Sequence, residues 1–182
     1  MSTRTAPIIT LAFVAALAVP SVPAQAETPT TAPSLTSNFI EAGGGAGSFS
    51  MVRAWDNMIG ADALQGTLKS LATTYGPSAK DQFVDIFDFA IADAWMRAGM
   101  DNVRLPQATG TRGPQLAMSV YHAGIAPNGS FGAGYLLENL LTPRVYFQVT
   151  SDINMKYGPD AAALFNRVDD QFFEDIGKQL QG

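Results

Sequence analysis

The chain has 182 residues, with no cysteine, a single histidine and a formal net charge of −5 at pH 7. The lack of cysteine excludes disulfides, thiolate metal sites and a cysteine nucleophile. The acidic balance, with no Lys/Arg cluster, argues against nucleic acids and anionic membrane surfaces as partners, because both carry negative charge.

Residues 1–26 have the layout of a cleavable signal peptide. Arg4 supplies a positive charge, Ile8 to Val19 form a short apolar run, and Ala24-Gln25-Ala26 is a small-x-small cleavage pattern. The apolar run is too short to span a membrane, which needs roughly twenty residues. We therefore expect cleavage after Ala26, no integral membrane segment in the mature protein, and a periplasmic or secreted location in a bacterium.

Residues 27–47 are predicted to be a flexible tether. Residues 27–37 are rich in Thr, Pro and Ser, and Gly43 to Gly47 add a run of small residues. A phosphate-binding loop would need a Lys-Ser/Thr ending or a Gly-x-Gly-x-x-Gly spacing, and neither is present. The folded part is therefore expected to cover residues 48–182 as one domain.

From residue 48 onward, apolar residues recur at the spacing of helices. Helices are expected from Ser50 to Tyr75 with a division near Gly60, over residues 78–98, from Pro114 to Gly124, over residues 131–141, and on both sides of Gly158. No segment has comparable support as a strand. The predicted fold is all-α, a single compact bundle of about five to seven helices.

Two Tyr-Gly-Pro corners interrupt this helical pattern. Tyr75-Gly76-Pro77 and Tyr157-Gly158-Pro159 each stand between two expected helices and are 82 positions apart. Glycine can take the left-handed conformation that ends a helix, and proline can occupy the first turn of the next one. Duplication of a helical hairpin would explain the repeat, and so would independent use of the same turn chemistry.

His122 is the only histidine, so a catalytic triad or an imidazole metal site would have to use it. It stands near the expected C-terminal end of a short helix, where the helix dipole favours a cation. One interpretation is an axial haem ligand, with Tyr121 and Phe131 lining an apolar pocket. The other is a partly exposed residue at a helix end.

The carboxylates give one further catalytic hypothesis. Glu138 stands among the leucines of residues 135–141, and an enclosed glutamate can act as a general acid in enzymes that cut glycan strands. Its polar neighbours at helical spacing also fit an ordinary wet helix face. Asp81, Asp85 and Asp88 share another helical face, which we interpret as solvated because one helix presents too few oxygens for calcium.

No catalytic residue, metal site or cofactor is assigned from the sequence. The predicted function is that of an exported, soluble, non-enzymatic binding or interaction module of the bacterial cell envelope. Its partner would be an unknown protein or a small apolar ligand. The alternatives are an envelope hydrolase that uses a carboxylate such as Glu138 or an aspartate, and a carrier of haem or another apolar ligand that uses His122.

Overall fold

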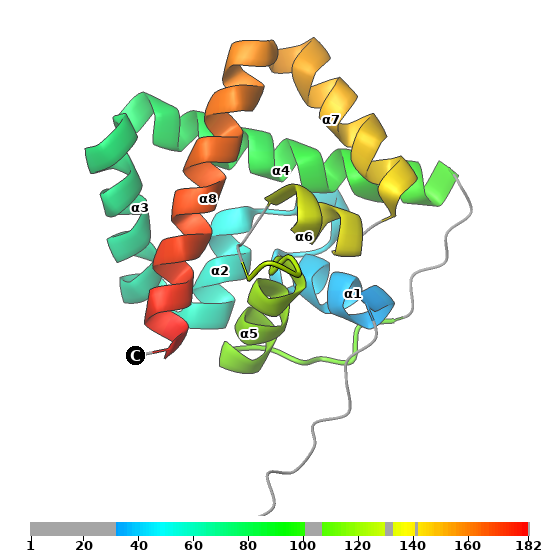
Figure 1. Ribbon diagram of the computed structural model, residues 1–182. Helices are drawn as coiled ribbons and strands as arrows, with labels where there is room; N and C mark the ends of the chain where they lie inside the picture. The colour runs from blue at the N-terminus through cyan, green and yellow to red at the C-terminus, as the bar shows by residue number, and fades with distance from the viewer. Residues whose placement is uncertain (1–31, 101–106, 130–132, 141, 182) are drawn as a thin grey trace, which may run out of the picture.

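The computed structural model of the protein describes residues 32–100, 107–129, 133–140 and 142–181. Over these residues the chain is helical and contains no strands (Figure 1). The elements are α1 (Ala32–Ala42), the 3₁₀ turn η1 (Ala46–Ser48), α2 (Met51–Ile59), α3 (Ala61–Tyr75), α4 (Pro77–Met100), α5 (Pro114–Ala123), α6 (Ala133–Leu140), α7 (Pro143–Tyr157) and α8 (Pro159–Gln181). The all-α prediction is confirmed, and the described part of the chain has one α-helix more than the expected maximum of seven. The predicted signal peptide, residues 1–26, lies outside the described residues.

The additional helix is α1, so the predicted tether does not extend through residues 32–47. Leu35, Phe39 and Ile40 lie on one side of α1 and are 6%, 1% and 4% exposed. The polar residues of α1 are also engaged: the Thr109 backbone N–H donates to Asn38 Oδ1 at 2.8 Å. The Thr- and Ser-containing composition of this segment therefore does not reveal the helix. Helix α1 packs on α2 and α5, and its apolar stripe is buried.

The glycine-rich segment after α1 is a specific turn. Gly44 and Gly45 have φ values of 101° and 92°, which side chains rarely tolerate. Gly43 lies against the ring of Phe49, where a Cβ atom would overlap the ring. Phe49 is buried in turn and contacts Phe39, with ring centroids 5.5 Å apart. The glycines thus let the chain reverse closely enough for α2 to pack on α1.

A single glycine joins consecutive helices at three corners, Gly60 between α2 and α3, Gly76 between α3 and α4, and Gly158 between α7 and α8. Their φ values are 87°, 92° and 86°, and their ψ values are 156°, 155° and 160°. The positive φ agrees with the left-handed expectation, but ψ lies in a more extended region that is almost confined to glycine. Each glycine N–H donates to the carbonyl four residues back, and each glycine carbonyl accepts from the N–H four residues on. One residue therefore ends one helix and begins the next.

The first four helices and the last four repeat at a constant spacing. The helix starts pair as Ala32 with Pro114, Met51 with Ala133, Ala61 with Pro143 and Pro77 with Pro159, and each pair is 82 positions apart. A hydrogen bond of 2.8 Å from Asn57 Nδ2 to the Ala42 carbonyl resembles one of 2.8 Å from Asn139 Nδ2 to the Ala123 carbonyl; the donors are 82 positions apart and the acceptors 81. Independent turn chemistry explains the corners but not these further matches, so the structure favours duplication of a four-helix unit.

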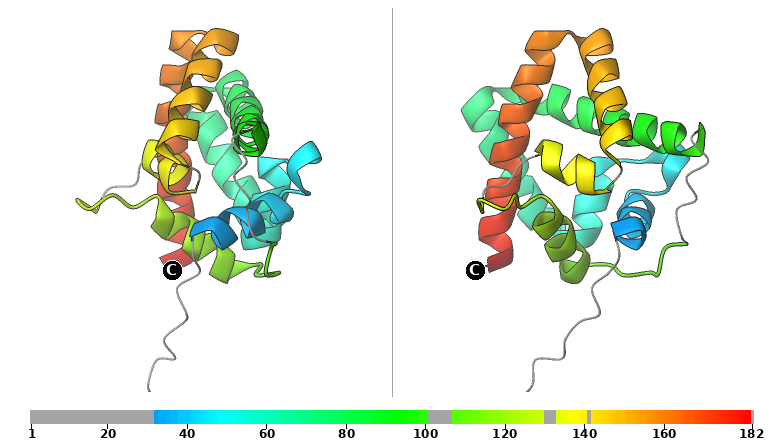
Figure 2. Two further views of the ribbon diagram at one scale, coloured as in Figure 1. Left: turned by 90° about the vertical axis from the view of Figure 1, so that its right-hand side faces the viewer. Right: turned by 45° about the vertical axis from the view of Figure 1, so that its right-hand side comes forward.

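The contacts between helices in one half recur between the corresponding helices of the other. Helices α4 and α8 cross each other (Figure 1). Phe83 of α4 stacks on its counterpart Phe165 of α8, with ring centroids 5.5 Å apart. Helix α3 packs on α4 and α8, and α7 correspondingly packs on α8 and α4. Figure 2 shows α1 and α5 at the end of the molecule away from the α7–α8 corner. The halves therefore share one core.

Candidate functional site

His122 lies in the last turn of α5, near the helix end where the sequence places it, and is exposed. It borders a surface groove of about 350 Å³ together with Pro114, Gln115, Met118 and Ser119. All five residues belong to α5, so within the described part of the chain the groove follows one side of one helix. A carrier would need an enclosed apolar cavity around the imidazole, and this groove is open. Phe131, the other aromatic residue of the carrier hypothesis, lies outside the described residues.

Glu138 is exposed on α6, while Leu136 and Leu140 of the same helix are buried. This pattern is that of an amphipathic helix, in which Leu136 and Leu140 face the core and Glu138 faces water. Its neighbour Asn139 ties α6 to the end of α5 through the hydrogen bond to the Ala123 carbonyl. The hydrolase alternative requires a carboxyl group enclosed by apolar side chains, and Glu138 is not enclosed.

The three aspartates on one face of α4 do not act together. Asp81 and Asp85 are exposed, whereas Asp88 accepts a 2.6 Å hydrogen bond from the backbone N–H of Met51, the first residue of α2. Burial raises the pKa of Asp88, the Met51 hydrogen bond opposes this effect, and the charge of Asp85 raises the pKa further. A negative charge at a helix N-terminus is favourable. Asp88 therefore anchors α2 to α4.

A buried carboxyl group in α8 is the most unusual polar feature of the core. Asp169 is 1% exposed and neither of its oxygens has a hydrogen-bond partner. Burial raises the pKa of Asp169 well above its usual range, and the charge of Asp170 raises it further. The sequence places Asp169 in an acidic run, but it stands four residues after Phe165 and three before Phe172. That spacing puts Asp169 on the apolar stripe of the helix. The spacing is the sequence signal that could have identified Asp169 as buried, and composition alone does not show it.

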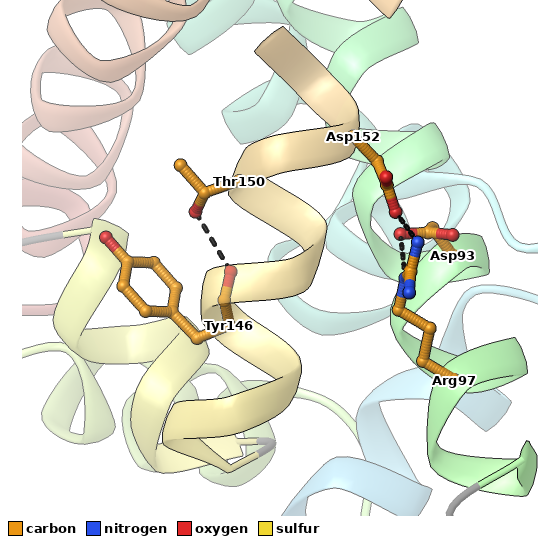
Figure 3. Close-up of polar contacts among 5 residues, drawn as sticks. All are labelled: Asp93, Arg97, Tyr146, Thr150 and Asp152. Atoms are coloured by element: carbon orange, nitrogen blue, oxygen red, sulfur yellow. Dashed lines mark hydrogen bonds and ion pairs between the residues drawn. The ribbon is translucent and has the colours of Figure 1, made fainter. Parts of the chain in front are cut away.

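An ion-pair cluster joins α4 to α7 (Figure 3). Arg97 Nε donates to Asp93 Oδ2 at 3.0 Å on the same helix, and its Nη2 donates to Asp152 of α7. Asp93 is 6% exposed, so its charge requires this partner. In the same view, the Thr150 hydroxyl donates to the Tyr146 carbonyl within α7 at 3.0 Å. Sequence reasoning does not find the cluster because Arg97 and Asp152 are 55 positions apart.

The described residues link the chain to no known class of site. No group of three His, Cys, Asp or Glu side chains among them is placed to hold a metal ion. No helix in the described ranges is long and apolar enough to cross a membrane. Comparisons of the chain with protein-family models, with curated proteins and with solved structures give no significant match.

Proposed function

We propose that the protein is an exported binding module of the bacterial cell envelope, which acts by contacting another protein and carries out no reaction itself. The proposal combines the signal-peptide pattern of residues 1–26 with a surface feature of the fold. Export places the protein in the periplasm or the medium. The surface feature indicates how it engages a partner there.

The observation that carries the proposal is the exposure of four large apolar side chains on two adjacent helices. Phe147 and Met155 on α7 are 69% and 75% exposed, and Met96 and Trp95 on α4 are 51% and 36% exposed. Single exposed apolar residues are common, but aromatic and methionine side chains are enriched where proteins bind one another. The pairing of Arg97 with Asp152 holds α4 and α7 together, so these side chains stand on a fixed support.

The internal repeat supplies a matched comparison for this surface. The counterparts of Phe147 and Met155 in the first half are Gln65 and Thr73, and both are exposed. The same position in the same fold therefore accepts a polar residue. Phe147 and Met155 are therefore not required for folding, which supports a role for them in binding.

The test is crosslinking in the envelope of living cells. The double variant Phe147→Gln/Met155→Thr carries the residues of the first half and should keep its helical circular dichroism and thermal midpoint. We expect the wild type to form a discrete crosslinked adduct with another protein and the variant to lose it. A control variant, Gln65→Ala/Thr73→Ala, should retain the adduct. Equal adducts from all three proteins would contradict the proposal, and so would an intact mass showing that Met1 is retained on membrane-bound material.

A further inference from the structure

The internal repeat makes it possible to compare the Arg97 cluster with the equivalent place in the other half. The first copy of this contact lies between α4 of the first half and α7 of the second half. There the guanidinium of Arg97 lies between Asp93 of its own helix and Asp152 of α7. The two carboxylates are 6% and 16% exposed. A hydrogen-bonded cation stabilises the charged form of a buried carboxylate, and a planar guanidinium can bond to both carboxylates at once.

The second copy of the contact, between α8 and α3, keeps one carboxylate and lacks the arginine. A shift of 82 positions relates Asp93 to Asp175, Arg97 to Gln179 and Asp152 to Ser70. The Gln179 amide turns away and donates to the Thr67 hydroxyl at 2.7 Å. The contact between α3 and α8 is thus equivalent to the contact between α7 and α4. It has no arginine at the position equivalent to Arg97, because that position is Gln179.

Asp175 is left with an unsatisfied acceptor. Its Oδ1 accepts a 2.9 Å hydrogen bond from Gln171 Nε2, whereas its Oδ2 is buried and has no partner. In the first copy the equivalent Oδ2, that of Asp93, receives the Arg97 N–H. Lys178 lies 3.6 Å from Asp175 Oδ1, but its Nζ is closer to Glu174, at 2.8 Å, and its side chain is 64% exposed. The lysine therefore adds charge at the rim without satisfying Oδ2.

A groove of about 290 Å³ opens at this place between α3 and α8. It is lined by Gly66, Thr67, Ser70, Asp175, Lys178 and Gln179. Gly66 contributes no side chain, and a Cβ atom built there would meet nothing within 4 Å. The equivalent positions in the first copy carry the larger side chains Gln148, Asp152 and Arg97. The groove thus corresponds to the space that the first copy fills with its own residues.

We infer that the groove between α3 and α8 binds a guanidinium group supplied from outside the chain. The group would enter beside Gln179, whose side chain is exposed and can move aside, and donate to Asp175. The hydroxyl oxygens of Ser70 and Thr67 would accept its remaining N–H bonds. The source would be either a small free guanidinium compound or an arginine side chain of a partner. This site is separate from the exposed apolar side chains of α4 and α7, and does not depend on them.

The test is a titration of the purified exported protein, labelled with ¹⁵N, followed by amide chemical shifts. The probes are agmatine, the peptide Gly-Arg-Gly and, as an ammonium control, butylamine. We expect saturable shifts centred on α3 and α8 with agmatine, the peptide or both, at roughly millimolar affinity, and weaker binding of butylamine. Saturation by agmatine alone would assign a free ligand, and markedly tighter binding of the peptide would assign a side chain.

Two variants and one control connect the shifts to the proposed residues. Asp175→Asn should weaken binding about tenfold or more, because it removes the charged acceptor. Gln179→Arg should abolish binding by filling the groove as Arg97 does, and it should raise the thermal midpoint only when Asp175 is present. Asp170→Asn removes the same charge from an exposed position of the same helix and should leave binding unchanged.

The inference fails if neither guanidinium probe gives saturable shifts. It also fails if Asp170→Asn weakens binding as much as Asp175→Asn, because the effect would then come from net charge. If Asp175→Asn does not fold, Gln179→Arg decides alone: unchanged agmatine binding in that variant would place the ligand elsewhere.

Discussion

Asp169 shows how a single residue can depart from the chemistry of its surroundings. In the first half its counterpart is Phe87, which is 4% exposed and contacts Phe83 and Phe165. The position therefore accommodates an apolar side chain, and the fold does not require a carboxyl group there. A buried acid without partners favours the protonated form, because burying the charge in an apolar core is costly.

This predicts a defined dependence of stability on pH. A carboxyl group whose pKa is raised by folding stabilises the folded state fully below the unfolded value of 3.8, and this contribution is lost as the pH rises through the folded-state pKa. At pH 7 the free energy of unfolding of the wild type is thus lowered, either because Asp169 is buried in its charged form or because it must take up a proton on folding. Asp169→Asn should raise the free energy of unfolding at pH 7 by roughly 1–3 kcal/mol. The gain should shrink towards about pH 4.

Urea denaturation of the wild type and Asp169→Asn at both pH values measures this difference. Asp170→Asn, at an exposed neighbour, is the control and should change the free energy of unfolding much less. The prediction would be contradicted if Asp169→Asn lowered the free energy of unfolding equally at both pH values. That result would mean that a partner in the fold needs the charged carboxylate.

At the scale of the elements, the glycine corners carry a clear stability prediction. Gly76 and Gly158 have a backbone conformation that side chains rarely adopt, although a Cβ atom at either site would have free space around it. Gly76→Ala and Gly158→Ala should therefore each lower the free energy of unfolding by about 1–3 kcal/mol, through backbone strain alone.

Gly66 provides the matched control for this experiment. It lies inside α3, is exposed and also has free space around a Cβ atom, but its backbone is helical. Gly66→Ala should raise the free energy of unfolding by roughly 0.5–1 kcal/mol, because alanine favours the helix. Thermal and urea denaturation of the three variants should thus give opposite signs. A stabilising effect at either corner would contradict the conformations described above.

A second element prediction concerns α1. Phe39 is 1% exposed and its ring contacts Phe49, Trp55 and Phe87. Phe39→Ala should cost about 3–5 kcal/mol of unfolding free energy, as expected for a buried aromatic residue. Glu41→Ala on the exposed side of the same helix should change stability by less than about 0.5 kcal/mol. No loss in Phe39→Ala would restore the tether interpretation of this segment.

A helix of this protein can be predicted from the sequence when its pattern of apolar residues is long and regular. Helices α4 and α8 are predictable because their apolar stripes run over many turns. Helix α1 is not, because Leu35, Phe39 and Ile40 make a short stripe within polar and small residues. The position of Asp169 is hidden by the acidic residues beside it. The Arg97 cluster and the α3–α8 groove need the packing of helices that are distant in the chain.

At the scale of the whole molecule, the internal repeat separates what the fold needs from what differs between its halves. The corners, the Phe83–Phe165 stack and the tie between the second and first helix of each half are shared. Exposed Phe147 and Met155 and buried Asp169 each occur in one half only, and the Arg97 cluster occurs at only one of the two equivalent contacts between the halves. Features that the fold can do without in one copy are the best candidates for function in the other.

The shared core also predicts how the halves behave when separated. Phe83 of the first half stacks on Phe165 of the second, and Trp55 contacts both Phe172 and Phe173 across the same boundary. A cut between Arg112 and Gly113 falls between α4 and α5 and leaves these aromatic rings without their partners. Each fragment alone should therefore lack a cooperative thermal transition, because too much apolar surface is exposed.

Mixing the two fragments in equal amounts should restore helical circular dichroism, a cooperative transition and a one-to-one complex by light scattering. Substituting Phe165→Ala in the second fragment should weaken reassembly, because the central stack is lost. The exposed change Phe147→Gln should leave reassembly intact, since that side chain lies outside the shared core. A cooperative transition in either fragment as a monomer would mean that the halves are independent domains. In that case the packing of α4 against α8 would be a contact between domains that fold separately.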